Sequence, residues 1–162
     1  MGCKELLIQW LNNAYAMENA MLEIMQNHAE IAEGIIKEEL QRHIDETRHQ
    51  EERAKMEIQR LGGKIVNPDA EKMTLIDAMI MMSKQGSPDK IVKAAIMDYA
   101  IEQLEIADYT AIIRLADECG EQETVEAIQE TLREENEMAE KTKALLPVVL
   151  DEFVSKFNQE TE

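Results

Sequence analysis

The sequence predicts an all-α protein in which four long helices form a bundle, with a long crossover connection between the second and the third helix. Three observations lead to this fold class. Apolar residues recur three and four positions apart almost throughout the chain, which is the spacing of one helix face. Hydrophobic residues make up 44% of the sequence, enough for a packed core. Aromatic residues make up only 4%, with 6 Gly and 3 Pro, which disfavours a β-sandwich or barrel.

The first half of the chain contains two of the long helices and the crossover. The first helix is expected at about residues 4–32 and the second at about 36–61, because Gly62 and Gly63 then end the periodic pattern. The crossover of about residues 64–87 carries a short helical pattern of its own. It ends before Pro88, a residue that suits the first turn of the next helix.

The second half contains the other two long helices. The third is expected from about Pro88 to Glu118, with Gly120 ending it. The fourth is expected at about residues 123–146. Pro147 cannot donate a backbone hydrogen bond, so it is expected to interrupt this helix. A short C-terminal helix at about 148–157 should follow.

Length and charge limit the classes of function. The 162 residues fit one domain, taken as 1–162, with a core bundle at about 4–146. The 17 basic and 34 acidic residues give a net charge of −17, which excludes nucleic acid as a favoured partner and attracts cations. No apolar run approaches the roughly 20 residues that span a membrane. With no recognisable secretory signal, a cytoplasmic protein is expected. The two cysteines, Cys3 and Cys119, allow at most one disulfide within the chain.

Acidic residues occupy several core-facing positions of the predicted helices. Glu18, Glu102 and Glu105 lie where a bundle normally has leucine, and His43 occupies a core-facing position of the second helix. Burying one unpaired carboxylate costs several kcal/mol, so a group of them requires compensating positive charge. Asp98 is expected to be an ordinary polar partner of this group. A pair of metal cations could neutralise four or more acids at once.

The two halves of the chain also resemble each other. The segment Tyr15-Ala16-Met17-Glu18 matches Tyr99-Ala100-Ile101-Glu102, and the same alignment pairs Glu46 with Glu134. The second helix then reads Glu46-Thr47-Arg48-His49, a Glu-x-x-His motif whose two side chains lie one turn apart on the same helix face.

Together these features predict a dinuclear metal site of the kind found in ferritin-like carboxylate bundles, where two helices give a Glu each and two give Glu-x-x-His. Carboxylate oxygens with one or two imidazoles suit two iron ions, with manganese as the other option. The internal repeat and the core-facing pattern indicate different ligands on the fourth helix. The repeat favours Glu134, whereas the core-facing pattern favours Glu135. The predicted metal ligands, with this choice and the choice between two histidines left open, are Glu18, Glu46, Glu102, Glu105, Glu134 or Glu135, and His49 or His43.

The chain resembles the YciE/YciF family of ferritin-like proteins over nearly its whole length. The stretches that carry this resemblance are 14–19, 43–48, 98–107 and 132–135. The resemblance implies a ferritin-like fold, a di-iron centre, a homodimer and a role in the response to stress. It carries ligand positions over to Glu18, His43, Glu46, Glu102, Glu105, Glu134 and Glu135. The family usually has His after the first Glu of the third-helix motif, where this chain has Gln103.

The predicted function is therefore a dinuclear metal protein that reacts with dioxygen or peroxide, as a ferroxidase does, with metal ions as its partners and neither nucleic acid nor membrane. The alternative is a non-catalytic helical stress or scaffold protein whose metal site is structural or vestigial. A third possibility, an oxygenase acting on a small organic molecule, would require a cavity beside the metals.

Overall fold

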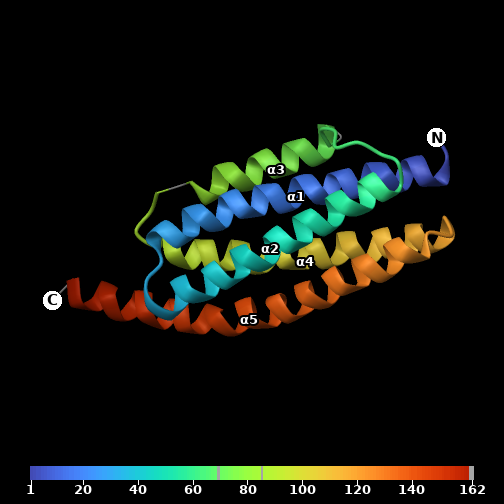
Figure 1. The fold of residues 1–162 in the computed structure, drawn as a ribbon. Coiled ribbons are helices and arrows are strands. Elements are labelled where there is room, and N and C mark those ends of the chain that lie inside the picture. Colours follow the sequence, from blue (N-terminus) through green and yellow to red (C-terminus); the bar gives the residue numbers. More distant parts are fainter. Residues whose placement is uncertain (69, 85, 161–162) are drawn as a thin grey trace.

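A computed structural model describes residues 1–68, 70–84 and 86–160 (Figure 1). Within these residues the chain forms helices and no strand. The elements are, in chain order, α1 (Cys3–Ile31), α2 (Gly34–Arg60), α3 (Ala70–Ser83), α4 (Lys90–Glu118) and α5 (Gln122–Glu160). The predicted all-α class and the helix inside the crossover are thus confirmed.

The four long helices form the bundle, and α3 lies along α1 on its outer side (Figure 1). α1 and α2 form one antiparallel hairpin, and α4 and α5 form another. Between the hairpins the crossover carries the chain, through α3, from one end of the bundle to the other (Figure 1). Because of this crossover, α2 and α4 run in the same direction.

Glycines close the long helices where the sequence predicted. Gly120 adopts φ +72, which a side chain with a Cβ rarely does, and the Glu121 N–H then donates to the Ala116 carbonyl. Gly63 has a packing role instead. A Cβ at this position would lie 2.6 Å from Cγ2 of Ile8 on α1, so only glycine lets the end of α2 approach α1 this closely.

The expected break at Pro147 is wrong. α5 is a single helix of 39 residues with Pro147 inside it, so the predicted short C-terminal helix is the continuation of α5. Proline removes one hydrogen bond of the helix ladder, at a typical cost of about 3 kcal/mol. Packing of residues beyond it offsets this cost, since Val149 is buried in an apolar cluster with residues of α1 and α2.

The apolar core is divided into two clusters. The first, which includes Leu7, Leu11 and Ile128, lies towards the start of α1. The second, which includes Met25, Ile36 and Leu40, lies towards the turn between α1 and α2. The buried acids Glu18 of α1, Glu102 and Glu105 of α4 and Glu135 of α5 fall between these two clusters, so a polar layer separates them.

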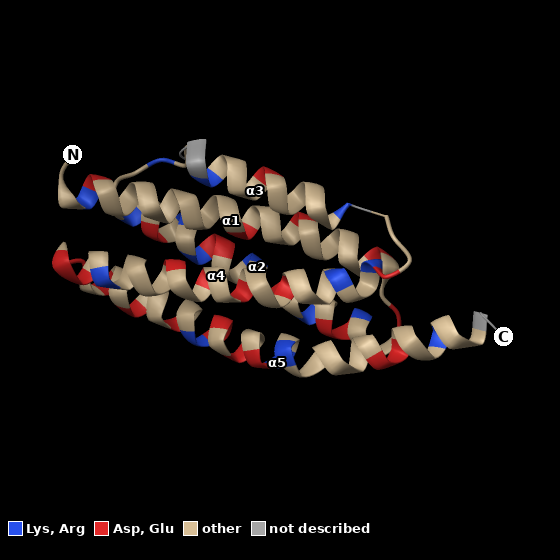
Figure 2. Cartoon of the chain, turned by 180° about the vertical axis from the view of Figure 1, so that it is seen from behind, with Lys and Arg blue, Asp and Glu red and all other residues tan. Residues whose placement is uncertain are grey.

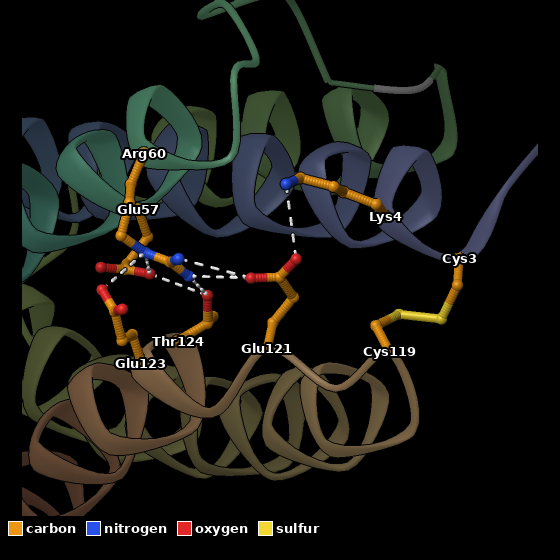
Figure 3. Close-up of polar contacts among 8 residues, drawn as sticks. All are labelled: Cys3, Lys4, Glu57, Arg60, Cys119, Glu121, Glu123 and Thr124. Carbon is orange, nitrogen blue, oxygen red and sulfur yellow. Dashed lines mark hydrogen bonds and ion pairs between the residues drawn. A yellow bond between two sulfur atoms is a disulfide. The ribbon is translucent and has the colours of Figure 1, made fainter.

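The end of the bundle beyond the first cluster, here called the disulfide end, is fastened by covalent and ionic links (Figure 3). A disulfide joins Cys3 at the start of α1 to Cys119 after α4, with 5.5 Å between their Cα atoms. Lys4 pairs with Glu121 at 3.4 Å. Arg60, at the end of α2, donates to the first turns of α5 and to its own helix, with acceptors on Glu57, Glu121 and Thr124.

No helix among the described residues is both long enough and apolar enough to cross a bilayer. Charged residues are distributed along all four long helices, with acidic ones in excess (Figure 2).

Candidate metal centre

Three of the four bundle helices contribute a carboxylate to one buried cluster in the middle of the polar layer. Glu18 of α1 is 1% exposed, Glu102 and Glu105 of α4 are 0% and 1%, and Glu135 of α5 is 1%. One carboxylate oxygen each from Glu102, Glu105 and Glu135 lie within 4.8 Å of one another. Glu102 and Glu105 share a helix face because they are three residues apart.

Most of the oxygens in this cluster have no hydrogen-bond donor. The unpartnered atoms are Oε2 of Glu18, Oε1 and Oε2 of Glu102, Oε1 of Glu105 and Oε1 of Glu135. A buried acceptor without a partner costs about 1–3 kcal/mol, and an ionised one costs more. Hard cations such as iron and manganese favour this donor set, so the residues present fit a metal pair.

Burial shifts the pKa of every carboxyl in the cluster upwards. It raises the pKa of Glu102 to about 8, and the charges of Asp98 and Glu46 add to the effect. Burial, followed by the charge of Glu135, raises the pKa of Glu18 and Glu105 well above their ordinary value. In the absence of cations these acids therefore take up protons near neutral pH, whereas bound cations would favour their ionised forms.

Tyr109 supplies the only direct hydrogen bond to Glu18 that the described residues show. Its hydroxyl, fully buried one turn beyond Glu105 on α4, donates to Oε1 of Glu18. Burial, with the nearby charges of Glu18 and Glu135, raises the pKa of Tyr109 well above its ordinary value, so the tyrosine keeps its proton. The bond leaves Oε2 of Glu18 as the oxygen that remains for another partner.

His43 is the histidine that reaches the cluster. It is buried on α2, and its Nε2 lies 2.9 Å from Oε1 of Glu102. The ring N–H is not aligned with that oxygen, since both oxygens of Glu102 remain without a hydrogen bond. Burial lowers the pKa of His43 to about 4, so its imidazole is neutral at pH 7, the form that binds metals.

Glu46 stands at the edge of the cluster. It is half-buried on α2, one turn beyond His43, and its charge raises the pKa of Glu102 and Glu135. Its carboxylate is therefore close enough to the cluster to act on it electrostatically while remaining partly exposed.

Two predicted ligands lie elsewhere. His49 is exposed, because six residues after His43 the helix has turned it by about 120° from the direction of His43. Glu134 points towards α2, where Arg53 donates to both of its oxygens at 2.9 and 3.2 Å. Adjacent residues on a helix are about 100° apart, so only Glu135 faces inwards. Of the alternatives left open, Glu135 and His43 therefore lie in the buried cluster, whereas Glu134, which the repeat favoured, and His49 do not.

The structure also pairs residues that the sequence left unassigned. His28 Nδ1 lies 2.7 Å from Oδ1 of Asp98, both buried, so Asp98 is the ordinary polar partner that was expected. Arg53 was not among the predicted site residues, because an arginine in an acid-rich helix is typical of a solvated surface. Its partners come from α5, far away in sequence, and no local pattern indicates them.

The chain matches the model of one protein family, described as "Domain of unknown function (DUF892)", over residues 2–155. It is also similar to several solved structures. A protein of Xanthomonas campestris is 28% identical, with 96% of this chain and 98% of that chain covered and a TM-score of 0.80. The E. coli stress protein YciF is 20% identical, with 93% and 98% covered and a TM-score of 0.76.

A third structure, from Bacillus anthracis str. Ames, is described as a ferritin like, diiron-carboxylate protein. It is 18% identical, covers 90% of this chain and 99% of its own, and has a TM-score of 0.71. At these identities the last two structures establish the fold alone. The expected ferritin-like bundle and the expected relationship to YciF-like proteins are both confirmed.

Proposed function

The chain belongs to the DUF892 family, and from this premise we propose that it is a dinuclear metal–carboxylate protein that reacts with dioxygen or peroxide in the manner of a ferroxidase. One observation carries the proposal: a set of buried carboxylate oxygens at the centre of the bundle has no hydrogen-bond donor. The ferritin like, diiron-carboxylate protein of similar fold supports it.

The residues that would hold the two ions, iron or manganese, come from all four long helices. They are Glu18, His43, Glu46, Glu102, Glu105 and Glu135. When bound, such a pair would supply two electrons, one from each ion, which with two protons suffice to reduce dioxygen to hydrogen peroxide or hydrogen peroxide to water.

The remaining side chains keep this centre isolated and in place. Two apolar clusters, one on each side of the polar layer, exclude water and so strengthen every charge interaction within it. Tyr109 fixes Glu18 by donating to one of its oxygens. Arg53 holds the neighbouring Glu134 outside the cluster.

Metal titration tests the proposal directly. The metal-free protein is titrated with Fe²⁺ without oxygen, and separately with Mn²⁺, and bound metal is measured by elemental analysis after dialysis. We expect about two ions per chain. Glu135→Gln should lose this binding, whereas the matched control Glu134→Gln should keep it, since that residue points away. Absence of binding to the unaltered chain, or equal binding by both variants, would contradict the proposal.

The alternative, a non-catalytic protein with a structural metal site, predicts a different result. A purely structural site would raise the melting temperature on metal binding without oxygen consumption. A ferroxidase-type centre should consume dioxygen or peroxide when ferrous iron is added. An oxygen electrode and a thermal melt on the same sample therefore separate the two.

We also propose that the chain forms a homodimer through α3. Met81 and Met82 at the end of this helix are 67% and 58% exposed, and Leu75 is 40% exposed. Exposed apolar side chains grouped in this way are typical of interfaces. Sedimentation of the unaltered chain and of the double variant Met81→Lys, Met82→Lys tests it, with a monomer expected only for the variant.

A cytoplasmic location remains part of the proposal. Thiols are kept reduced in that compartment, so some molecules there should carry Cys3 and Cys119 as free thiols. Alkylation of thiols at the moment of cell lysis measures that fraction.

A further inference from the structure

A small cavity lies next to the candidate metal centre, on the side away from the disulfide end. Its volume is about 40 Å³, and α2, α4 and α5 form most of its wall. His43 lines this cavity and also approaches Glu102, so its imidazole borders both the cavity and the carboxylate cluster.

The wall of the cavity is mostly apolar. The larger side chains that line it are Ile36, Leu40, Ile91, Met138, Leu145 and Val149. Two further lining residues, Ala94 and Ala95, are consecutive on α4, and their lack of bulk leaves the space open.

Among the polar residues of the wall, two pair with each other, one approaches the carboxylate cluster and two reach solvent. His28 pairs with Asp98 at 2.7 Å, and His43 lies against Glu102. Glu39 and Lys141 are partly or fully exposed and mark the side on which the cavity meets solvent. A cavity with a mostly apolar wall favours a small uncharged occupant over ordered water.

The volume restricts the occupant further. Pockets for organic ligands of drug size measure about 300–1,000 Å³, far more than this cavity offers. One water requires roughly 10–15 Å³, so the space suits a diatomic molecule or a few waters. This size also argues against the third possibility raised by the sequence, an oxygenase with an organic substrate beside the metals.

We propose that this cavity is the binding site from which dioxygen reaches the metal centre. The proposal rests on the proposed function, because dioxygen is useful there only if metals occupy the neighbouring carboxylates. It assigns dioxygen to the apolar side at His43 and leaves the half-buried Glu46 side for charged and polar reactants.

Xenon gas, an apolar probe of similar size, tests the site without relying on activity. Crystals of the protein pressurised with xenon should show one anomalous peak between Ala94 and His43. Ala94→Leu should abolish the peak by filling the space. Ala94→Val, which adds less volume, should reduce the peak and replaces the leucine variant if that variant does not fold. Thr142→Val, which changes a lining hydroxyl to a methyl at constant volume, should leave the peak in place.

Metal content is measured on the same samples, so the two proposals fail separately. Bound metal with no xenon peak, or with ordered water filling the cavity, overturns the cavity proposal. A xenon peak without any bound metal overturns the proposed function and with it the role of the cavity as an entry site. With metal present, Ala94→Leu should slow oxidation by dioxygen and leave oxidation by hydrogen peroxide unchanged, and equal slowing of both overturns the assignment to dioxygen.

Discussion

The two ends of the bundle are held together by different means. At the disulfide end, a covalent bond, an arginine with several acceptors and a tightly packed apolar cluster join α1, α2, α4 and α5 (Figure 3). At the opposite end, here called the cavity end, apolar packing surrounds an open space, and the buried His28–Asp98 pair is the main polar link. The carboxylate cluster lies between the two.

This difference indicates where the molecule can open at low cost. Local unfolding starts where restraints are few, and the cavity end lacks the disulfide and the arginine network of the disulfide end. The stability supplied by the disulfide end offsets the cost of the cavity and of the mutually repelling acids, so the fold is kept. The predictions below test this division, beginning with the largest expected effect.

The first prediction concerns the charge of the layer between the two ends. Since the pKa of Glu102 is raised from 4.5 to about 8, its contribution to the stability of the metal-free protein is complete below about pH 4.5 and is lost as pH rises through about 8. By itself this shift corresponds to at most about 5 kcal/mol. His43 acts in the opposite direction, since its lowered pKa costs stability as pH falls from 6.5 towards 4.

The net decline of the metal-free protein should therefore be steepest between pH 6.5 and about 8. Urea unfolding across this range measures it, and hydrogen exchange should show amides of the cavity end opening before those of the disulfide end. An unfolding free energy that does not change with pH would show that the buried acids do not destabilise the bundle. Opening of the disulfide end before the cavity end would contradict the proposed difference between the two ends.

The second prediction removes the covalent link. The Cys3–Cys119 bond spans 116 positions of sequence, and closing a ring of that size restricts the unfolded chain. The double variant Cys3→Ser, Cys119→Ser should lose about 4–5 kcal/mol, the upper value from chain entropy. Denaturant unfolding of the variant, with the unaltered chain under oxidising and reducing conditions as control, measures the loss. If reduction leaves the midpoint unchanged, ionic links alone hold this end.

The third prediction compares one leucine from each end. Leu11 is 0% exposed in the cluster of the disulfide end, whereas Leu40 is 9% exposed and already borders the cavity. Leu11→Ala should cost about 3–4 kcal/mol and Leu40→Ala about 2 kcal/mol, because the second change enlarges a space that exists. Urea unfolding of both variants gives the difference, and equal costs would mean that the two ends are packed equally well.

The fourth prediction has the smallest effect. Arg60→Ala removes a donor to the buried Glu57 and Thr124 and should cost about 1–2 kcal/mol. Arg48→Ala is the matched control, because Arg48 pairs with Asp45 on the exposed face of the same helix and should cost under about 0.5 kcal/mol. Similar losses of stability for both variants would show that the ionic links of Arg60 do not stabilise the disulfide end.

Much of the fold follows from local sequence. α1, α2 and α4 begin and end within a few residues of their predicted limits, because apolar spacing and the glycines at 62, 63 and 120 act locally. Pro147 was misjudged, since packing beyond the proline outweighs its local penalty and no local pattern reports packing.

The candidate site was predictable in part. The core-facing pattern correctly indicated that Glu18, Glu102, Glu105 and Glu135 are buried. The choice between neighbouring candidates depends on the rotation of each helix about its axis, which contacts with other helices set, so His43 could not be preferred to His49 from sequence alone. The bond between Cys3 and Cys119 joins residues too far apart for any local signal, although both cysteines were visible. That the buried acids bind metal stays a prediction.

The bond between α1 and the turn after α4 also decides what proteolysis can do to this molecule. It converts residues 3–119 into a closed loop, from which α5 leaves as a tail. A protease that nicks the exposed stretch at residues 64–67 opens the loop but releases no fragment, and the two pieces separate on a gel only after reduction. A cut within α5, in contrast, gives two pieces that separate on a denaturing gel in either thiol state.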